Sequence, residues 1–185
     1  MASRRKHLQF TLLIASAFFM LSAEMLLPVY AVFVEHIGGD LVTAGISYAA
    51  FMLSVGILVY FIAKWEDRHK HKGKFVFASY IVKTAAIGAY LFVTTPLQLF
   101  AVQALLGISE AVNVPAYDAM YTKSIRRGHY AEGWGLWESM YYIVAGLGAI
   151  GGGLVAEFYG FPMLIGCMLV LSFIGLLISW RLVRE

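Results

Sequence analysis

Charged residues and cysteine are both scarce in this sequence of 185 residues. Asp, Glu, Lys and Arg together make up 14% of the chain, whereas hydrophobic residues make up 61%. A soluble domain of this size needs a more polar surface, so this composition excludes a soluble protein and predicts a surface that contacts lipid. The single cysteine, Cys167, excludes an intrachain disulfide.

Histidine is missing from the apolar segments, because all five histidines lie in polar connections or near the start of the chain. His69 and His71 lie near Glu66 and Asp67, but single-residue spacing in a polar connection is a weak metal signal. The glycines at 151–153 follow no strand and lie in an apolar run, so they are no phosphate loop. We therefore expect no enzyme activity, no catalytic residue, no metal site and no cofactor apart from a coupling proton.

What the sequence does contain is a series of apolar segments, each long enough to cross about 30 Å of hydrocarbon. The predicted membrane spans are residues 8–34, 44–63, 75–94, 97–121, 134–156 and 162–180. Short connections make neighbouring spans antiparallel, within a single domain over residues 1–185. The predicted fold class is therefore an all-α membrane protein with six transmembrane helices.

The distribution of basic residues predicts the orientation of these spans. Every Lys and Arg except Lys83 lies before the first span, in the second or fourth connection, or after the last span. Glu35, Asp40 and Glu157 lie in the remaining connections, which contain no Lys or Arg. By the positive-inside rule, both termini are predicted to be cytoplasmic, in the cell (inner) membrane. The net charge of +3 then reflects topology and indicates no nucleic-acid partner.

A few charged residues fall inside the predicted spans, where each costs roughly 2.5–3.5 kcal/mol at mid-depth and has to face protein, water or another charge. They are Glu24, Lys83, Glu110, Asp118 and Glu138. Glu24 and Glu110 lie too deep to reach bulk water easily, and a carboxyl group there can bind and release a proton. Two interpretations of Lys83 stay open, namely that it extends to the inner interface or that it pairs with an acid.

Helical spacing groups polar residues of the fourth span on one face. Gln103, Glu110 and Tyr117 follow one stripe, and Asn113 lies one turn beyond Glu110. We predict that these four residues and Glu24 line a cavity for substrate or protons.

Small residues of the fifth span form rows that permit close helix approach, and they include Gly148, Gly152 and Gly153. We expect these rows to contact another helix.

Two segments resemble motifs of major facilitator superfamily transporters. The family pattern after the second span is a glycine, three residues, Asp-Arg, then a glycine and basic residues. Asp67 and Arg68 match it and basic residues follow, while Ala63 and Lys70 stand in place of the glycines. The fourth span also resembles that of the family, with Gln103 where an arginine is usual.

The resemblance covers nearly the whole chain and corresponds to the N-terminal half of such a transporter. It implies two inverted three-helix repeats, with the first and fourth spans lining the cavity and the second and fifth meeting the other half. It also implies that Arg68 pairs with Asp118 at the cytoplasmic face and that Asp67 faces a helix of that other half. Glu138 is expected to pair with a cytoplasmic Lys or Arg.

Since family members usually carry twelve spans, we expect a half-size secondary-active transporter of a small solute. We expect it to work by alternating access and to couple transport to protons. The expected partner is a second copy in a parallel homodimer, with Gly148, Gly152 and Gly153 at the interface. Two alternatives stay open, namely a membrane accessory or scaffold subunit without transport, and one half of a heterodimeric transporter.

Overall fold

The computed structural model describes the backbone of residues 2–184 and the side chains of residues 5–184. Over this range every regular element is helical. The elements are α1 (Ala2–Leu26), η1 (Leu27–Val29), α2 (Tyr30–His36), α3 (Leu41–Glu66), α4 (Lys72–Ala89), η2 (Tyr90–Phe92), α5 (Pro96–Ser124), α6 (Tyr130–Ser179) and η3 (Trp180–Arg184). Within the described residues, five helical segments are long and apolar enough to cross a membrane. The predicted all-α class is therefore confirmed.

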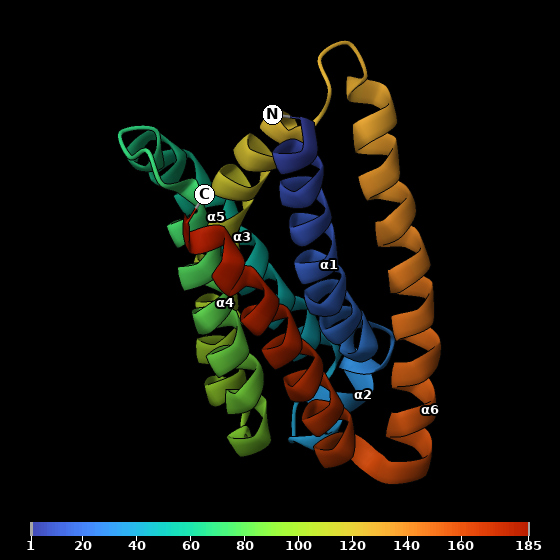
Figure 1. Cartoon of the computed structure of the whole chain (residues 1–185). Coiled ribbons are helices and arrows are strands. Elements are labelled where there is room, and N and C mark those ends of the chain that lie inside the picture. The colour runs from blue at the N-terminus through green and yellow to red at the C-terminus, as the bar shows by residue number, and fades with distance from the viewer. Residues whose placement is uncertain (1, 185) are drawn as a thin grey trace.

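The last of these segments, Tyr130–Arg184, contains both the fifth and the sixth predicted spans. Gly160 interrupts α6 with φ 78° and ψ 173°, a backbone conformation that favours glycine. Figure 1 shows that the chain reverses direction there, so that α6 consists of a first arm (130–159) and a second arm (161–179) that run in opposite directions. The count of six separate spans stays a prediction.

A smaller irregularity, without a reversal of the chain, occurs in the first apolar segment at Pro28. This residue lies in the short 3₁₀ turn η1, between α1 and α2. Because proline lacks a backbone N–H and its ring clashes with the preceding turn, it ends the regular helix a few residues after Glu24.

The helices pack around two apolar clusters. The first includes Met25, Leu99 and Leu164, and the second includes Leu12 and Val76. The most extensive contacts join α1 to α6 and α3 to α5, and α4 packs against both α5 and α6. By contrast, only 6% of the most apolar 18-residue stretch of α3 is buried, whereas 39% of the corresponding stretch of the α4 segment is buried. Therefore α3 presents most of its apolar surface outward.

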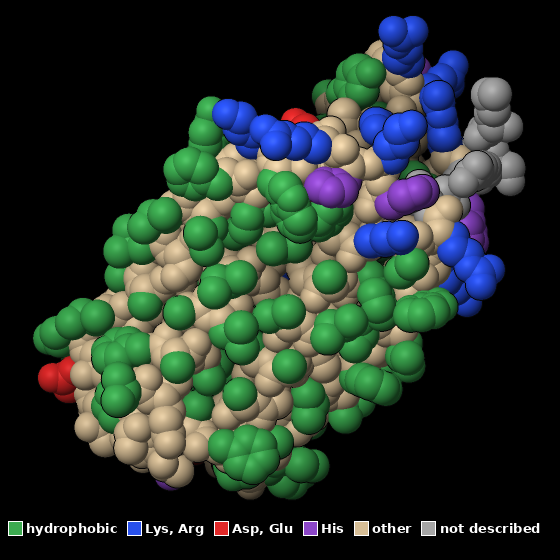
Figure 2. Space-filling view, turned by 90° about the vertical axis from the view of Figure 1, so that its left-hand side faces the viewer, with side chains coloured by type: hydrophobic (Ala, Val, Ile, Leu, Met, Phe, Trp, Pro, Cys, Tyr) green, Lys and Arg blue, Asp and Glu red, His purple; other side chains and the backbone are tan. Residues whose placement is uncertain are grey.

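Basic side chains gather at one end of the molecule. Figure 1 places both ends of the chain, the α3–α4 connection and the α5–α6 connection at this end. Figure 2 shows Lys and Arg side chains there, with hydrophobic side chains over the rest of the visible face. The grouping of charges therefore agrees with the predicted alternation, while the assignment of this end to the cytoplasm stays a prediction.

Two of the three glycines predicted at a dimer interface pack within the chain instead. A Cβ added at Gly148 would lie 2.9 Å from Glu24 Cβ, and one added at Gly152 would lie 1.9 Å from the carbonyl oxygen of Met25. Both positions therefore allow the first arm of α6 to approach α1 closely. A Cβ at Gly153 would meet nothing within 4 Å, so its contact with a second copy stays a prediction.

Candidate functional site

A cavity of about 660 Å³ lies among α1, α3, α4, α5 and the first arm of α6. Most of its wall consists of aromatic and aliphatic side chains. The residues predicted to line a cavity all do so: Glu24, Gln103, Glu110, Asn113 and Tyr117. Lys83 and Asp118 line it as well. Their placement is thus established, and their roles in binding or proton transfer stay predictions.

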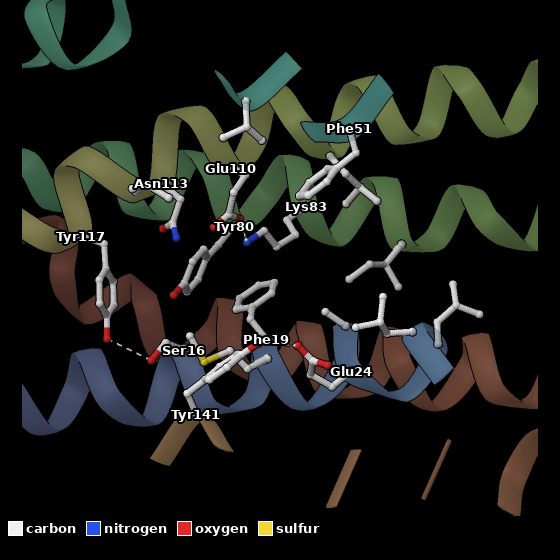
Figure 3. A pocket seen from close by; sticks show the side chains of 18 of the residues that line it. Ser16, Phe19, Glu24, Phe51, Tyr80, Lys83, Glu110, Asn113, Tyr117 and Tyr141 are labelled. Atoms are coloured by element: carbon white, nitrogen blue, oxygen red, sulfur yellow. Dashed lines mark hydrogen bonds and ion pairs between the residues drawn. The ribbon is translucent and has the colours of Figure 1, made fainter. Parts of the chain in front are cut away.

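Lys83 pairs with Glu110, which decides between the two interpretations that the sequence left open. The Lys83 ammonium on α4 contacts the Glu110 carboxylate on α5, and the two side chains are 15% and 28% exposed, respectively. The ammonium nitrogen also lies 5.7 Å from the ring centroid of Phe19 and 5.9 Å from that of Tyr80. Aromatic ring faces attract cations at such distances. One carboxylate and two rings therefore hold the lysine inside the cavity (Figure 3).

Glu24 lies on the opposite wall of the cavity from this pair. Figure 3 shows its carboxylate on α1, facing the space that separates it from Lys83 and Glu110. Its hydrogen-bond donor is the hydroxyl of Tyr141, at 3.4 Å from Oε1. Among the described side chains, no Lys, Arg or His forms an ion pair with Glu24. Glu110 is therefore already paired, whereas Glu24 faces open space and, like Asp118, forms no ion pair among the described side chains.

Toward the basic end, hydrogen bonds to Tyr117 connect three helices. The hydroxyl of Tyr117 on α5 lies 3.0 Å from Ser16 Oγ on α1 and accepts a hydrogen bond from Trp137 Nε1 on α6 at 3.2 Å. The Tyr117 ring stacks on Tyr121, whose hydroxyl donates to the carbonyl oxygen of Gly133 at 2.6 Å. These contacts hold α1, α5 and the first arm of α6 together beside the cavity at the basic end.

Toward the other end, a second group of hydrogen bonds connects α5, α2 and α3. The amide of Gln103 donates to the hydroxyl of Tyr30, which lies 2.6 Å from Ser47 Oγ. The Lys83–Glu110 pair thus lies between two sets of interhelical hydrogen bonds.

Among the described side chains, the Arg68–Asp118 pair that the resemblance implies is not formed. Asp67 pairs with Lys72 at 3.0 Å, and Arg68 is exposed. Asp118 lines the cavity, and among the described side chains neither Asp118 nor Glu138 forms an ion pair. Arg68 therefore has no contact with Asp118 here, and the expectation that Asp67 faces a partner's helix stays a prediction.

Glu138 is exposed and lies outside the cavity, although its helix contributes to the wall. The residues that the first arm of α6 places there are Trp134, Trp137 and Tyr141. Within residues 2–184, no group of three or more His, Cys, Asp or Glu side chains is arranged to hold a metal ion.

Several cavity residues were absent from the prediction, among them Ser16, Phe19 and Tyr80. Ser16 lies eight residues before Glu24, so helical periodicity places it on the same face of α1 and could have identified it. No comparable signal identifies Phe19 or Tyr80, because aromatic residues are equally common in cores and on lipid-facing surfaces.

A bundle of apolar helices around a cavity that contains charged side chains is typical of a multi-pass membrane protein. The chain belongs to the Major Facilitator Superfamily, whose family model matches residues 12–185. Members of this superfamily are membrane transporters. No curated protein sequence matches the chain.

Proposed function

We propose that this chain is a half-size secondary transporter of a small solute, in which two parallel copies form the transport pathway. One observation carries the proposal, namely that a single chain lines the charged cavity without enclosing it. Tyr48 and Met52 on α3 line the cavity and are still 41% and 46% exposed. A transport pathway has to be shielded from lipid, and a second copy against α3 and α6 would supply the missing wall.

In the proposed topology, the two arms of α6 are separate spans, which makes six spans in two inverted three-helix repeats with cytoplasmic termini. The basic end supports the orientation, because Lys and Arg are retained on the cytoplasmic side. The reversal at Gly160 supports the division of α6. In this arrangement, spans two and five are α3 and the first arm of α6, the two elements that border the open side of the cavity.

The Lys83–Glu110 pair supplies a mechanism for proton coupling. When the Glu110 carboxylate takes up a proton, its charge is neutralised and its attraction for the Lys83 ammonium falls. The ammonium then reorients within the rings of Phe19 and Tyr80 or toward another acid, and the α4–α5 contact loosens. Release of that proton on the other side of the membrane restores the pair, which completes one cycle of alternating access.

Crosslinking of single cysteines in native membranes tests the proposed dimer. In a Cys167→Ser background, Leu53→Cys on α3 and Leu147→Cys on α6 replace side chains that are 62% and 60% exposed. We expect crosslinks between copies from these two positions, and none from Leu177→Cys on the second arm of α6, which is equally exposed at 60%. Crosslinks that form only from Leu177→Cys would overturn the proposed interface.

Proton flux in proteoliposomes tests transport itself. Panels of organic cations, neutral sugars and carboxylates are added to vesicles that contain a pH-sensitive dye. We expect one class to drive a proton flux that Glu110→Gln abolishes. A dimeric preparation in which no class drives a flux would contradict transport and favour an accessory role.

A further inference from the structure

We propose that the cavity binds an organic cation with an apolar body, whose positive charge is held by Glu24. This inference rests on the proposed function, in which the cavity is the substrate site, and it names the class of substrate.

The charges around the cavity favour a cation over an anion. The charged lining residues are Glu24, Lys83, Glu110 and Asp118. The one cation among them, Lys83, is already paired with Glu110. An anionic substrate would therefore have to compete with Glu110 for Lys83. Glu24 and Asp118 have no cationic partner among the described side chains, and Glu24 is the one that faces the Lys83–Glu110 pair across the cavity (Figure 3).

Lys83 itself demonstrates how this cavity holds a positive charge. Its ammonium contacts a carboxylate and lies near the rings of Phe19 and Tyr80. The opposite wall also places a carboxylate near aromatic residues, and it holds no cation among the described side chains, since Glu24 accepts a hydrogen bond from the hydroxyl of Tyr141. The Tyr141 ring stacks in parallel on Trp137, with centroids 5.8 Å apart. A carboxylate beside electron-rich rings is the usual environment of a bound ammonium group.

The size and the wall of the cavity indicate an organic rather than an inorganic cation. A volume of about 660 Å³ lies within the range of roughly 300–1,000 Å³ that is typical of sites for small organic molecules. An inorganic cation such as Ca²⁺ needs six to eight oxygen ligands. Phe19, Phe51 and Tyr80 instead provide apolar surface, suited to the hydrocarbon part of a substrate.

The test uses two probes of the same shape and opposite charge, tetraphenylphosphonium and tetraphenylborate. Their binding to the purified chain is measured by equilibrium dialysis in detergent, with protein-free micelles as the blank. We expect saturable binding of the phosphonium and none of the borate. Equal binding of both ions, or binding of the borate alone, would overturn the inference, and so would the absence of phosphonium binding.

Two variants test which residues hold the positive charge of the phosphonium probe. Glu24→Gln is expected to weaken phosphonium binding by about tenfold or more, since it removes the charge and keeps the shape. Tyr141→Leu, which leaves the carboxylate in place, is expected to weaken it about threefold to thirtyfold through loss of the ring. Glu157→Gln is the matched control, because Glu157 is exposed and lies outside the cavity. Wild-type affinity in Glu24→Gln would overturn the assignment of the charge to Glu24, and wild-type affinity in Tyr141→Leu would overturn the role of the Tyr141 ring.

The same probe separates this inference from the proposed function. Phosphonium that binds but is not taken up by proteoliposomes would contradict transport and leave the cation site standing. Uptake of a sugar or a carboxylate by a preparation that does not bind phosphonium would overturn the cation site and leave transport standing.

Discussion

Lys83 and Glu110 form an ion pair between α4 and α5, within a cavity whose opposite wall carries a second carboxylate. The pair connects two helices that contact each other along much of their length. Because it lies in a largely apolar surrounding, each partner depends on the other for its charge to be tolerated. Disrupting the pair should therefore affect stability and function together.

Lys83→Met is predicted to reduce the free energy of unfolding by about 1–3 kcal/mol, because it leaves the Glu110 carboxylate without its partner. The value lies below the roughly 3–5 kcal/mol of a fully buried pair because the Glu110 side chain is 28% exposed. The double variant Lys83→Met/Glu110→Gln should be more stable than Lys83→Met alone. Thermal unfolding in detergent measures both, with Lys123→Met as an exposed control. Additive losses in the double variant would contradict a direct coupling.

Gly152→Ala is predicted to destabilise the chain, and Gly153→Ala is not. A Cβ at position 152 would lie 1.9 Å from the carbonyl oxygen of Met25, so α1 and α6 would have to move apart. Such overpacking typically costs about 1–3 kcal/mol. Gly153 is the matched control, since a Cβ there meets nothing within 4 Å. Thermal unfolding of the monomer in detergent is the measurement, and equal midpoints for the two variants would contradict the close packing of α1 on α6.

The polar stripe of the fourth span was predictable because helical periodicity alone decides which residues share a face. Gln103, Glu110 and Tyr117 all line the cavity, as their spacing indicated. Periodicity could not identify the partner of a glycine row, because Gly148 and Gly152 permit close approach by a helix of the same chain or of another. The residues of α5 were therefore easier to predict than the contacts of α6.

The rotation of the first arm of α6 about its own axis decides which of its residues line the cavity and leaves Glu138 outside it. Residues at i+3 and i+4 flank the same helical face on opposite sides, about 100° apart. Counted from Trp134, Trp137 is the i+3 residue and Glu138 is the i+4 residue. Trp137 lines the cavity together with Trp134 and Tyr141, whereas Glu138 is exposed outside it. Only the packing of α6 against α1 sets this rotation, so the sequence pattern could not supply it.

The pH dependence of stability should contain a contribution from Asp40, which caps α3. Its carboxylate accepts hydrogen bonds from the hydroxyl and the backbone N–H of Thr43, and these bonds lower the pKa of Asp40 below its usual value of 3.8. A lowered pKa in the folded state stabilises the protein above the unfolded pKa, and this contribution is lost as the pH falls through the folded pKa. Asp40→Asn should keep the cap and lack this acid-dependent loss. Thermal midpoints from pH about 6 to 3 measure it, and identical profiles for the wild type and Asp40→Asn would contradict the prediction.

Glu66→Met is predicted to stabilise the chain. Glu66 is 0% exposed at the end of α3, and within the described part of the chain neither of its carboxylate oxygens has a hydrogen-bond partner. Lys72, the nearby lysine, pairs with Asp67 instead. A buried polar group without a partner costs about 1–3 kcal/mol, and methionine fills a similar volume without this cost. Thermal unfolding should therefore give a higher midpoint for Glu66→Met, whereas Glu138→Met, at an exposed position, should leave it nearly unchanged. A lower midpoint for Glu66→Met than for the wild type would contradict the prediction, because it would mean that the Glu66 carboxylate stabilises the fold.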